Sequence, residues 1–305
     1  MSETSVVIFG ASGKVGSIAA RTAHQNGVKV FLALRDINKP IPGLSAEEER
    51  SGGFGRVTAD LDRPDTVDAA IRHTGAKRAF FYASHSSSGF MRETIKALKK
   101  SGIEFAVFLS SYTITGEPGD VQQEDLVAYL HAQVEMNLKE IFGSHEYVAI
   151  RPGSFATNLL RYKPQILSGT VHLYSPDYRF DYVAPEDIGA VCGSILAKGG
   201  TDCPNYVYVH GPKQMTQRYG IALIADTLER DVRFEDANEE QELITLSSIG
   251  IPKHVACYII NKLKDPSIET PEQQLAEGRE SIRRFAGREP MSLHSWLRQN
   301  KQSFM

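Results

Sequence analysis

The sequence is short of cysteine, of excess charge and of long apolar segments, and each shortage excludes a class of protein. Three cysteines without close spacing predict reduced thiols in a cytoplasmic protein rather than a disulfide framework. A net charge of −3 gives no electrostatic reason to expect nucleic acid binding. No apolar run approaches the ~20 residues of a membrane span, so we expect no membrane segment. The amino terminus, MSETSVVIFG, lacks the basic start and longer apolar stretch of a signal peptide.

Two kinds of enzyme site are missing from the sequence as well. There is no G-x-S-x-G motif, so a serine hydrolase would lack its nucleophile elbow. The histidines between residues 24 and 131 have no zinc-site spacing with one another or with the cysteines, so we predict no metal. The 305 residues are 41% hydrophobic and 23% charged, which suits a globular protein of one large domain or two smaller ones.

The stretch VVIFGASGKVG contains a glycine-rich turn between a predicted strand and a predicted helix. Residues 6–9 form the continuous apolar run of a buried parallel strand, and residues 14–26 have apolar side chains at helical spacing. Gly10 permits a tight turn, Gly13 lets the backbone approach a pyrophosphate, and Gly16 lets the helix pack on the strand. The free N–H groups at the helix N-terminus would then bind the anion.

This turn predicts a bound dinucleotide, although its spacing is G-x-x-G-x-x-G rather than the usual G-x-G-x-x-G. The alternative is a tight strand-to-helix turn that holds no ligand. If a cofactor binds here, the residues expected to contact it are Gly10, Ser12, Gly13, Lys14 and Val15.

Apolar strands alternate with amphipathic helices through the first half of the chain, and this predicts a right-handed, doubly wound parallel sheet. The polar, glycine-rich stretch at 41–53 is expected to be a loop. The strands are predicted at residues 6–9, 28–34, 56–59, 76–84, 103–111 and 146–153, and the helices at 14–26, 64–75, 90–102 and 124–143, with Asp62 and Pro64 marking the start of the second helix.

The alternation loosens after Pro152, and we expect a smaller, partly interleaved C-terminal lobe there. Two short strands are predicted within 171–183, a helix at 184–200, and a seventh strand at 205–211 that returns to the main sheet. Mostly helix follows, with one short strand at 231–236. The predicted domains are a nucleotide-binding domain at 1–158 and a substrate-binding lobe at 159–305, with the segments near 183–211 returning to the first domain.

The end of the second strand predicts which nicotinamide cofactor binds. An acidic residue there would bind the ribose of NAD, but Arg35 occupies this place and Asp36 follows it. The planar fork of an arginine can hold two oxygens of the 2′-phosphate of NADP, and Lys39 adds a second positive charge. Asp36 can point to solvent as a turn residue. The sequence therefore favours NADP(H). The alternative is that Arg35 and Lys39 are ordinary charged residues of a surface loop.

Ligands of open α/β sheets bind at the carboxyl ends of the strands, so further contacts can be placed by position. Asp60 and Leu61 follow the third strand and would border the adenine. Ala83 and Ser84 follow the fourth strand and would pass along the nicotinamide ribose. The whole site would draw on residues 10–15, 35–39, 60–61, 82–90, 110–117 and 151–158.

Several motifs together resemble one protein family. They are GASGKVG, LALRD followed by a lysine, ADLDRP, LSSY, HAQVE, IRPGSFATNLL and YVAPEDIGAV. The chain resembles the NmrA-like branch of the atypical short-chain dehydrogenase/reductases, whose relatives include triphenylmethane reductase, NADPH quinone reductases and isoflavone-type reductases. The resemblance implies a Rossmann fold, NADP(H) binding and either hydride transfer or redox sensing. It also implies cofactor contacts from Gly153, Ser154 and Phe155.

The Tyr-x-x-x-Lys signature of the wider superfamily, which supplies a proton donor and a ribose contact, is absent. Tyr129 is followed four residues later by Gln133. The family often has a lysine or histidine four residues before the glutamate of this helix, and here that residue is His131, which would contact the nicotinamide ribose or carry a proton. The alternative is a surface histidine paired with Glu135. Tyr112 is a second candidate acid and His85 a third.

The sequence leaves three functions open. The first is an NADPH-dependent reductase of a small, largely apolar carbonyl, imine, enone or quinone. The second is a non-catalytic protein that senses NADP(H), and the third is an isomerase or cyclase on the same fold. Substrate contacts are expected from His85, Phe155, Leu159 and Tyr162, with Tyr182 as a further aromatic wall. The alternative for these aromatic and apolar side chains is a place in the core.

Overall fold

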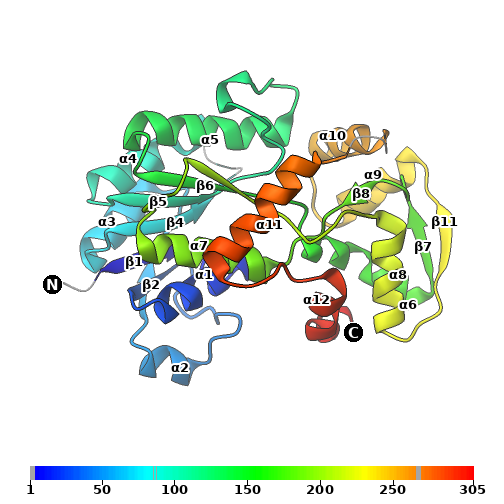
Figure 1. Ribbon diagram of the computed structural model, residues 1–305, viewed down its shortest axis with the longest axis horizontal. Helices are drawn as coiled ribbons and strands as arrows, with labels where there is room; N and C mark the ends of the chain where they lie inside the picture. Colours follow the sequence, from blue (N-terminus) through cyan, green and yellow to red (C-terminus); the bar gives the residue numbers. More distant parts are fainter. Residues whose placement is uncertain (1–3, 85, 87, 266–268) are drawn as a thin grey trace. The chain divides into compact units, whose positions relative to one another are not determined.

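The computed structural model describes residues 4–84, 86, 88–265 and 269–305. Its main element is a sheet of seven strands in the order β3-β2-β1-β4-β5-β6-β9, and every neighbouring pair is parallel (Figure 1). The predicted doubly wound sheet is confirmed, and so is the return of the seventh strand beside β6. The strands are β1 (Ser5–Phe9), β2 (Lys29–Leu34), β3 (Gly55–Thr58), β4 (Arg78–Tyr82), β5 (Phe105–Leu109), β6 (Tyr147–Pro152) and β9 (Tyr206–Val209).

Helices cover both faces of this sheet, with α3, α4 and α5 on one side and α1 and α7 on the other (Figure 1). The strands are mostly apolar because helices cover both faces of the sheet. One core cluster joins Phe9 of β1, Phe81 of β4 and Phe108 of β5 to the helices. The helices are α1 (Lys14–Gln25), α3 (Pro64–Thr74), α4 (Arg92–Lys100), α5 (Leu126–Phe142) and α7 (Pro185–Lys198).

Two glycines of α7 allow unusually close contact with α1. A Cβ atom on Gly189 would lie 2.5 Å from Cβ of Ile18, and one on Gly193 would lie 2.5 Å from the backbone oxygen of Ala19. Both distances are shorter than real Cβ contacts, so larger residues would push the helices apart. The two glycines thus fix the position of α1, the helix that follows the glycine-rich turn.

The stretch 41–53 was predicted to be a loop, and this is wrong because it contains helix α2 (Ala46–Ser51). Ser45 and Glu48 form a capping box, in which each side chain bonds to the backbone N–H of the other residue. The helix is short and polar, so it shows no apolar periodicity. Its Glu49 is buried and forms a two-pronged ion pair with Arg56 of β3, which attaches α2 to the sheet.

The chain divides into two compact units. Unit 1 contains the main sheet and consists of the residues up to Pro152, Pro185–Val209 and Glu280–Glu289. Unit 2 consists of Gly153–Ala184, His210–Arg279 and Pro290–Met305. The chain therefore passes between the units several times, which makes them interleaved. The division of roles between a cofactor domain and a substrate lobe, with a boundary at 158/159, stays a prediction.

Unit 2 is built from two small strand pairs and several helices around its own apolar core. β7 (Thr170–Leu173) pairs in parallel with β11 (Arg233–Asp236), and β8 (Arg179–Phe180) pairs antiparallel with β10 (Met215–Thr216). The strands predicted within 171–183 and at 231–236 are confirmed as β7, β8 and β11, whereas β10 was not predicted. Trp296 and Tyr162 are among the largest buried side chains of the core. The helices are α6 (Lys163–Ser168), α8 (Gln217–Thr227), α9 (Glu239–Ser248), α10 (Lys253–Leu263), α12 (Leu293–Gln299) and the first part of α11 (Glu272–Ala286).

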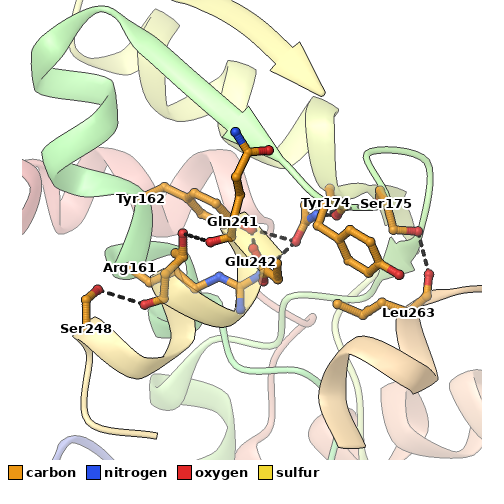
Figure 2. Close-up of polar contacts among 10 residues, drawn as sticks. Arg161, Tyr162, Tyr174, Ser175, Gln241, Glu242, Ser248 and Leu263 are labelled. Carbon is orange, nitrogen blue, oxygen red and sulfur yellow. Dashed lines mark hydrogen bonds and ion pairs between the residues drawn. The ribbon is translucent and has the colours of Figure 1, made fainter. Parts of the chain in front are cut away.

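A buried polar cluster lies beside this core. Arg161 donates hydrogen bonds to the hydroxyl of Tyr162 (2.6 Å) and to Oε1 of Gln217 (3.0 Å), and its guanidinium lies 3.5 Å from the carboxylate of Glu242 (Figure 2). Burial raises the pKa of Glu242, and the charge of Arg161 only partly opposes this. Nearby, Ser175 donates to the carbonyl of Leu263 (Figure 2). These contacts attach α9 and α10 to the rest of unit 2.

Candidate functional site

The glycine-rich turn has the geometry that its sequence predicts. Gly10 has a φ of +73°, and a Cβ atom there would lie 2.5 Å from the ring of Tyr82, so only glycine fits. A Cβ atom on Gly16 would lie 2.2 Å from the carbonyl oxygen of Gly10, which is the close helix-to-turn packing that the spacing indicates. The N–H of Gly13 donates to the carbonyl of Gly10 at 2.9 Å and closes the turn.

The N-terminus of α1 is open for an anion. Gly13 is its N-cap, and within the described residues no side chain caps it and no acidic residue lies in its first turn. The first N–H groups of a helix have no partner inside the helix, and its dipole adds partial positive charge. Gly13 and Lys14 are exposed, Ser12 is half-buried, and Val15 packs inward. This end of α1 fits a pyrophosphate.

The loop after β2 presents two exposed basic side chains, Arg35 and Lys39. Asp36 is a turn residue, because its carboxylate accepts a hydrogen bond from the N–H of Asn38 (3.0 Å) and its carbonyl accepts one from the N–H of Lys39 (3.1 Å). Arg56 donates to the carbonyl of Lys39 at 3.0 Å and holds the loop against β3. Both residues are exposed, but the carboxylate of Asp36 is engaged by the backbone of its own turn.

The ends of β3 and β4 are joined through Asp62, a residue that the sequence analysis assigned to a helix start. The structure corrects this: the N-cap of α3 is Arg63, and Asp62 accepts hydrogen bonds from the hydroxyls of Ser84 (2.5 Å) and Ser86 (2.6 Å). These bonds hold the pKa of Asp62 below its usual range. The predicted cofactor contacts after β3 and β4 differ in burial: Leu61 and Ala83 are buried, whereas Asp60 and Ser84 are half-buried.

Two of the three candidate proton donors lie in the described part of the chain, Tyr112 just after β5 and His131 on α5. Tyr112 is half-buried, and its N–H donates to the carbonyl of Pro152 at the end of β6 (3.1 Å). His131 is half-buried as well, and its Nδ1 lies 2.8 Å from the carbonyl oxygen of Val127. A carbonyl oxygen only accepts, so Nδ1 carries the proton and Nε2 of the neutral ring carries the lone pair. The ring centroid of His131 lies 6.2 Å from that of Phe108 on β5.

A buried polar network, which was not predicted from the sequence, connects the end of β5 with α5 and β6. Ser110 donates to Oε1 of Glu135 at 2.5 Å, and Arg151 donates to both oxygens of the same carboxylate at 3.1 and 2.8 Å. Arg151 also donates to the carbonyls of Ile114 (3.2 Å) and Gly116 (3.3 Å) in the loop after Tyr112. The network therefore shapes the backbone on both sides of Ser111 and Tyr112.

Arg151 stays charged in the interior because it is paired with Glu135. Arg151 is fully buried and Glu135 is 2% exposed. Burial alone would lower the pKa of Arg151, but its hydrogen bonds to Glu135 and the charge of that carboxylate more than offset this, so the pKa is raised. The guanidinium also lies over the ring of Tyr206, 4.0 Å from its centroid. The sequence signal for this pair is a charged residue at a buried position in each element, a glutamate on the inner side of α5 and an arginine within β6.

The predicted contacts after β6 belong to unit 2. A Cβ atom on Gly153 would lie 2.1 Å from a carboxylate oxygen of Asp181, and the N–H of Ser154 donates to the other oxygen at 2.8 Å. Phe155 forms a parallel bridge with Val183. Asp181 also accepts from His210 and from the N–H of Gly211, both at 2.9 Å. This buried carboxylate fixes the backbone of residues 153 and 154.

The predicted substrate contacts are placed in different environments. Leu159, Tyr162 and Tyr182 lie in the apolar core of unit 2, and the hydroxyl of Tyr162 bonds to Arg161 and Gln217. The core alternative describes these three side chains. Phe155 is half-buried, and His85 lies outside the described residues.

A cavity of about 780 Å³ lies along α5 in unit 1. Its described lining includes the buried pair Glu135 and Arg151 together with Tyr147 and Tyr206, but no residue of the predicted cofactor set. Burial raises the pKa of Tyr147 to about 12, so its hydroxyl keeps its proton at neutral pH. Within the described residues, no helix is both long and apolar enough to cross a bilayer.

Comparison with known proteins identifies the family. The profile of a family described as NAD(P)H-binding matches residues 10–198, which include the glycine-rich turn, the main-sheet strands β2 to β6, and α7. The chain belongs to the NAD(P)H-binding family. This confirms the predicted nicotinamide cofactor as NAD(P)H, and it agrees with the open N-terminus of α1.

A relative of 30% identity confirms the predicted NmrA-like branch, and solved structures of lower identity share the fold. The nitrogen metabolite regulation-like protein bik4 of Gibberella fujikuroi is 30% identical, and the alignment covers 96% of this chain and 95% of that protein. The NADPH complex of the quinone oxidoreductase QOR2 of Escherichia coli has a TM-score of 0.71 at 18% identity, covering 95% of this chain and 97% of that one. The triphenylmethane reductase of Citrobacter sp. also has a TM-score of 0.71, at 13% identity, with coverages of 98% and 99%.

Proposed function

We propose that this protein is an NADPH-dependent reductase that transfers hydride to a small, largely apolar carbonyl, imine, enone or quinone. The observation that carries the proposal is the combination of an open α1 N-terminus with an exposed Arg35 at the end of the neighbouring strand. Solved structures that share the fold include enzymes described as a quinone oxidoreductase and a triphenylmethane reductase. Those names support hydride transfer as the chemistry.

The proposed choice between the two nicotinamide cofactors rests on Arg35. β1 and β2 are adjacent and parallel, so the glycine-rich turn and Arg35 follow the same edge of the sheet. A 2′-phosphate would give Arg35 and Lys39 a doubly charged anionic partner, whereas a ribose hydroxyl is neutral and would gain less from their positive charge. Asp36 is the acid at this position, and its carboxylate is bonded to Asn38 within the turn. We therefore propose NADP(H) rather than NAD(H).

The cofactor supplies the hydride, so the protein has to position groups and handle one proton. In the neutral form of His131, Nε2 accepts a hydrogen bond, which suits a ribose hydroxyl; the ring donates from Nε2 only when it is protonated. Tyr112 has a phenolic O–H that donates in its ordinary state. We propose Tyr112 as the proton donor and His131 as the ribose contact, and the reverse assignment requires the imidazolium form of His131.

A redox-sensing regulator is the second candidate. The relative named as nitrogen metabolite regulation-like covers almost the whole chain at 30% identity, and the Tyr-x-x-x-Lys signature is missing from α5. A sensor would use the same cofactor edge but would turn nothing over. The two candidates share the binding prediction and differ in chemistry.

Turnover separates the two candidates. Purified protein is incubated with NADPH and a panel of quinones, enones, aldehydes and imines, and the loss of nicotinamide absorbance is followed. A reductase oxidises NADPH in the presence of at least one acceptor and forms an equal amount of reduced product. Tyr112→Phe provides the matched control, because it removes the proposed donor and keeps the ring. Tight NADPH binding without oxidation by any acceptor would contradict the reductase proposal and favour the sensor.

A further inference from the structure

The turn between β4 and α4 has an unusual backbone. Gly89, Phe90 and Met91 are consecutive left-handed residues with φ values of 61°, 53° and 61°. Glycine adopts this conformation readily, but the Cβ atoms of Phe90 and Met91 disfavour it. A strained turn of this kind persists only where its surroundings hold it, and such turns concentrate at functional sites.

Asn137 on α5 holds the turn. Its Nδ2 donates to the carbonyls of both Gly89 (3.2 Å) and Phe90 (3.1 Å). Its Oδ1 accepts from Arg92 at 2.7 Å, and this second bond sets the orientation of the amide. Arg92 is itself paired with Glu140 one turn further along α5. An asparagine is needed here because a single side chain supplies two donors to the turn and one acceptor to the arginine.

The other side of the turn faces the cofactor edge of the sheet. Met91 is fully buried, and its Sδ accepts the backbone N–H of Ser84 at 3.2 Å. Ser84 lies just past the end of β4 and donates to Asp62. The ring of Phe90 packs edge-on against Tyr129, 5.7 Å between centroids. A chain of direct contacts thus leads from Asn137 through the left-handed turn to Ser84.

We propose that Asn137 is a positioning residue for cofactor binding, acting through the turn Gly89–Met91 on Ser84. The inference rests on the proposed function and on the expectation that Ser84, just past the end of β4, borders the nicotinamide ribose. Asn137 itself touches neither the glycine-rich turn nor the residues after β5 in any hydrogen bond of the described part of the chain. Asn137 should therefore affect NADPH binding by raising the fraction of molecules in which the turn Gly89–Met91 has the conformation that binds the cofactor.

The test uses the full chain and three variants. Asn137→Ala removes both donors; Asn137→Asp keeps an oxygen for Arg92 but places carboxylate against the two carbonyls; Lys139→Gln changes an exposed side chain on the same helix and is the matched control. We expect both Asn137 variants to weaken NADPH binding about tenfold, because each loses the two hydrogen bonds that hold the turn. Lys139→Gln should bind NADPH like the wild type. Hydrogen exchange at residues 89–91 should become faster in the Asn137 variants.

A rescue experiment distinguishes positioning from general stability. Phe90→Gly makes the left-handed conformation accessible without a Cβ penalty, so adding it to Asn137→Ala should recover part of the NADPH affinity. It also removes the contact with Tyr129, so it should not raise thermal stability. If Asn137→Ala does not fold, Asn137→Asp carries the same comparison.

The outcomes separate this inference from the proposed function. If the wild type fails to bind NADPH, the proposed function falls, and the positioning role falls with it. If the wild type binds NADPH and both Asn137 variants bind it equally well with unchanged exchange at 89–91, only the positioning role is overturned. If affinity falls in proportion to thermal stability and Phe90→Gly restores neither, Asn137 is a stabilising residue and the inference is wrong.

Discussion

Removing one member of the buried pair Glu135 and Arg151 should destabilise the protein strongly. Arg151 is fully buried and donates to both carboxylate oxygens, at 3.1 and 2.8 Å. Glu135→Leu leaves the guanidinium charge buried with neutral partners only, and breaking such a pair costs about 3–5 kcal/mol. Arg151→Met leaves the carboxylate with Ser110 as its remaining donor, and we expect a loss of similar size.

The double variant Glu135→Leu/Arg151→Met should be more stable than either single variant. Neither charge remains, and the carbonyl of Ile114 keeps the hydroxyl of Tyr208 as a donor at 2.9 Å. The carbonyl of Gly116 loses its arginine but is exposed, so water can replace it. The remaining loss is about 1–2 kcal/mol, from these hydrogen bonds and that of Ser110.

Urea unfolding of the wild type, both single variants and the double variant measures these differences as a double-mutant cycle. The structure predicts strong non-additivity, with the double variant less destabilised than either single one. Additive losses, or single variants within about 0.5 kcal/mol of the wild type, would refute the reasoning. Additive losses would show that the two charges are not coupled, and near-neutral single variants would show that Arg151 is solvated and that its pairing contributes little.

Three further predictions concern the cofactor turn, the proton path and unit 2. Gly13→Val should abolish NADPH binding in calorimetry while circular dichroism shows a folded protein, and normal affinity would mean that the turn binds no pyrophosphate. If Nε2 accepts from the ribose, His131→Ala should lower NADPH affinity by a larger factor than it lowers kcat, and His131→Lys should retain the orienting role. If the ring is the acid, His131→Ala should lower kcat by ~10²-fold or more. No change in NADPH affinity or in kcat would show that His131 contributes neither a ribose contact nor a proton. Burial raises the pKa of Glu242 above 4.5, so the wild type loses stability relative to Glu242→Gln as the pH rises from about 4.5, and a Tm difference independent of pH would contradict this.

The fold and the cofactor turn could be predicted from the sequence because their signals are local. The apolar run at 6–9, the glycines at 10, 13 and 16 and the following helix lie within one short stretch, and the structure has the strand, the turn and the helix there. The return of residues 205–211 to the main sheet could also be predicted, because an apolar strand after a helix continues the alternation.

The features that were missed depend on contacts between distant residues or on weak local signals. Ser110, Glu135 and Arg151 are separated by 25 and 16 positions, and no spacing in the sequence connects them. Asp62 resembles a helix cap until Ser84 and Ser86 are seen beside it. The short helix α2 lacks an apolar face, and only its Ser-x-x-Glu capping box could have indicated it.

The left-handed turn had a single visible signal, Gly89. Phe90 and Met91 give no local indication of a positive φ, because their conformation is imposed by Asn137 and by the burial of Met91. Likewise, Leu159 and Tyr162 were assigned to a substrate wall from residue type alone, and residue type does not distinguish a pocket wall from a core.

The central claim is that Arg35 recognises the 2′-phosphate of NADPH at the edge of the sheet, and titration of both cofactors tests it most directly. NADPH and NADH are titrated into the wild type and Arg35→Ala by calorimetry at fixed ionic strength. The wild type should prefer NADPH, and Arg35→Ala should lose about ten- to a hundredfold in NADPH affinity, the value of a charge-assisted hydrogen bond, with little change for NADH. Equal affinities of the wild type for NADPH and NADH would contradict the claim.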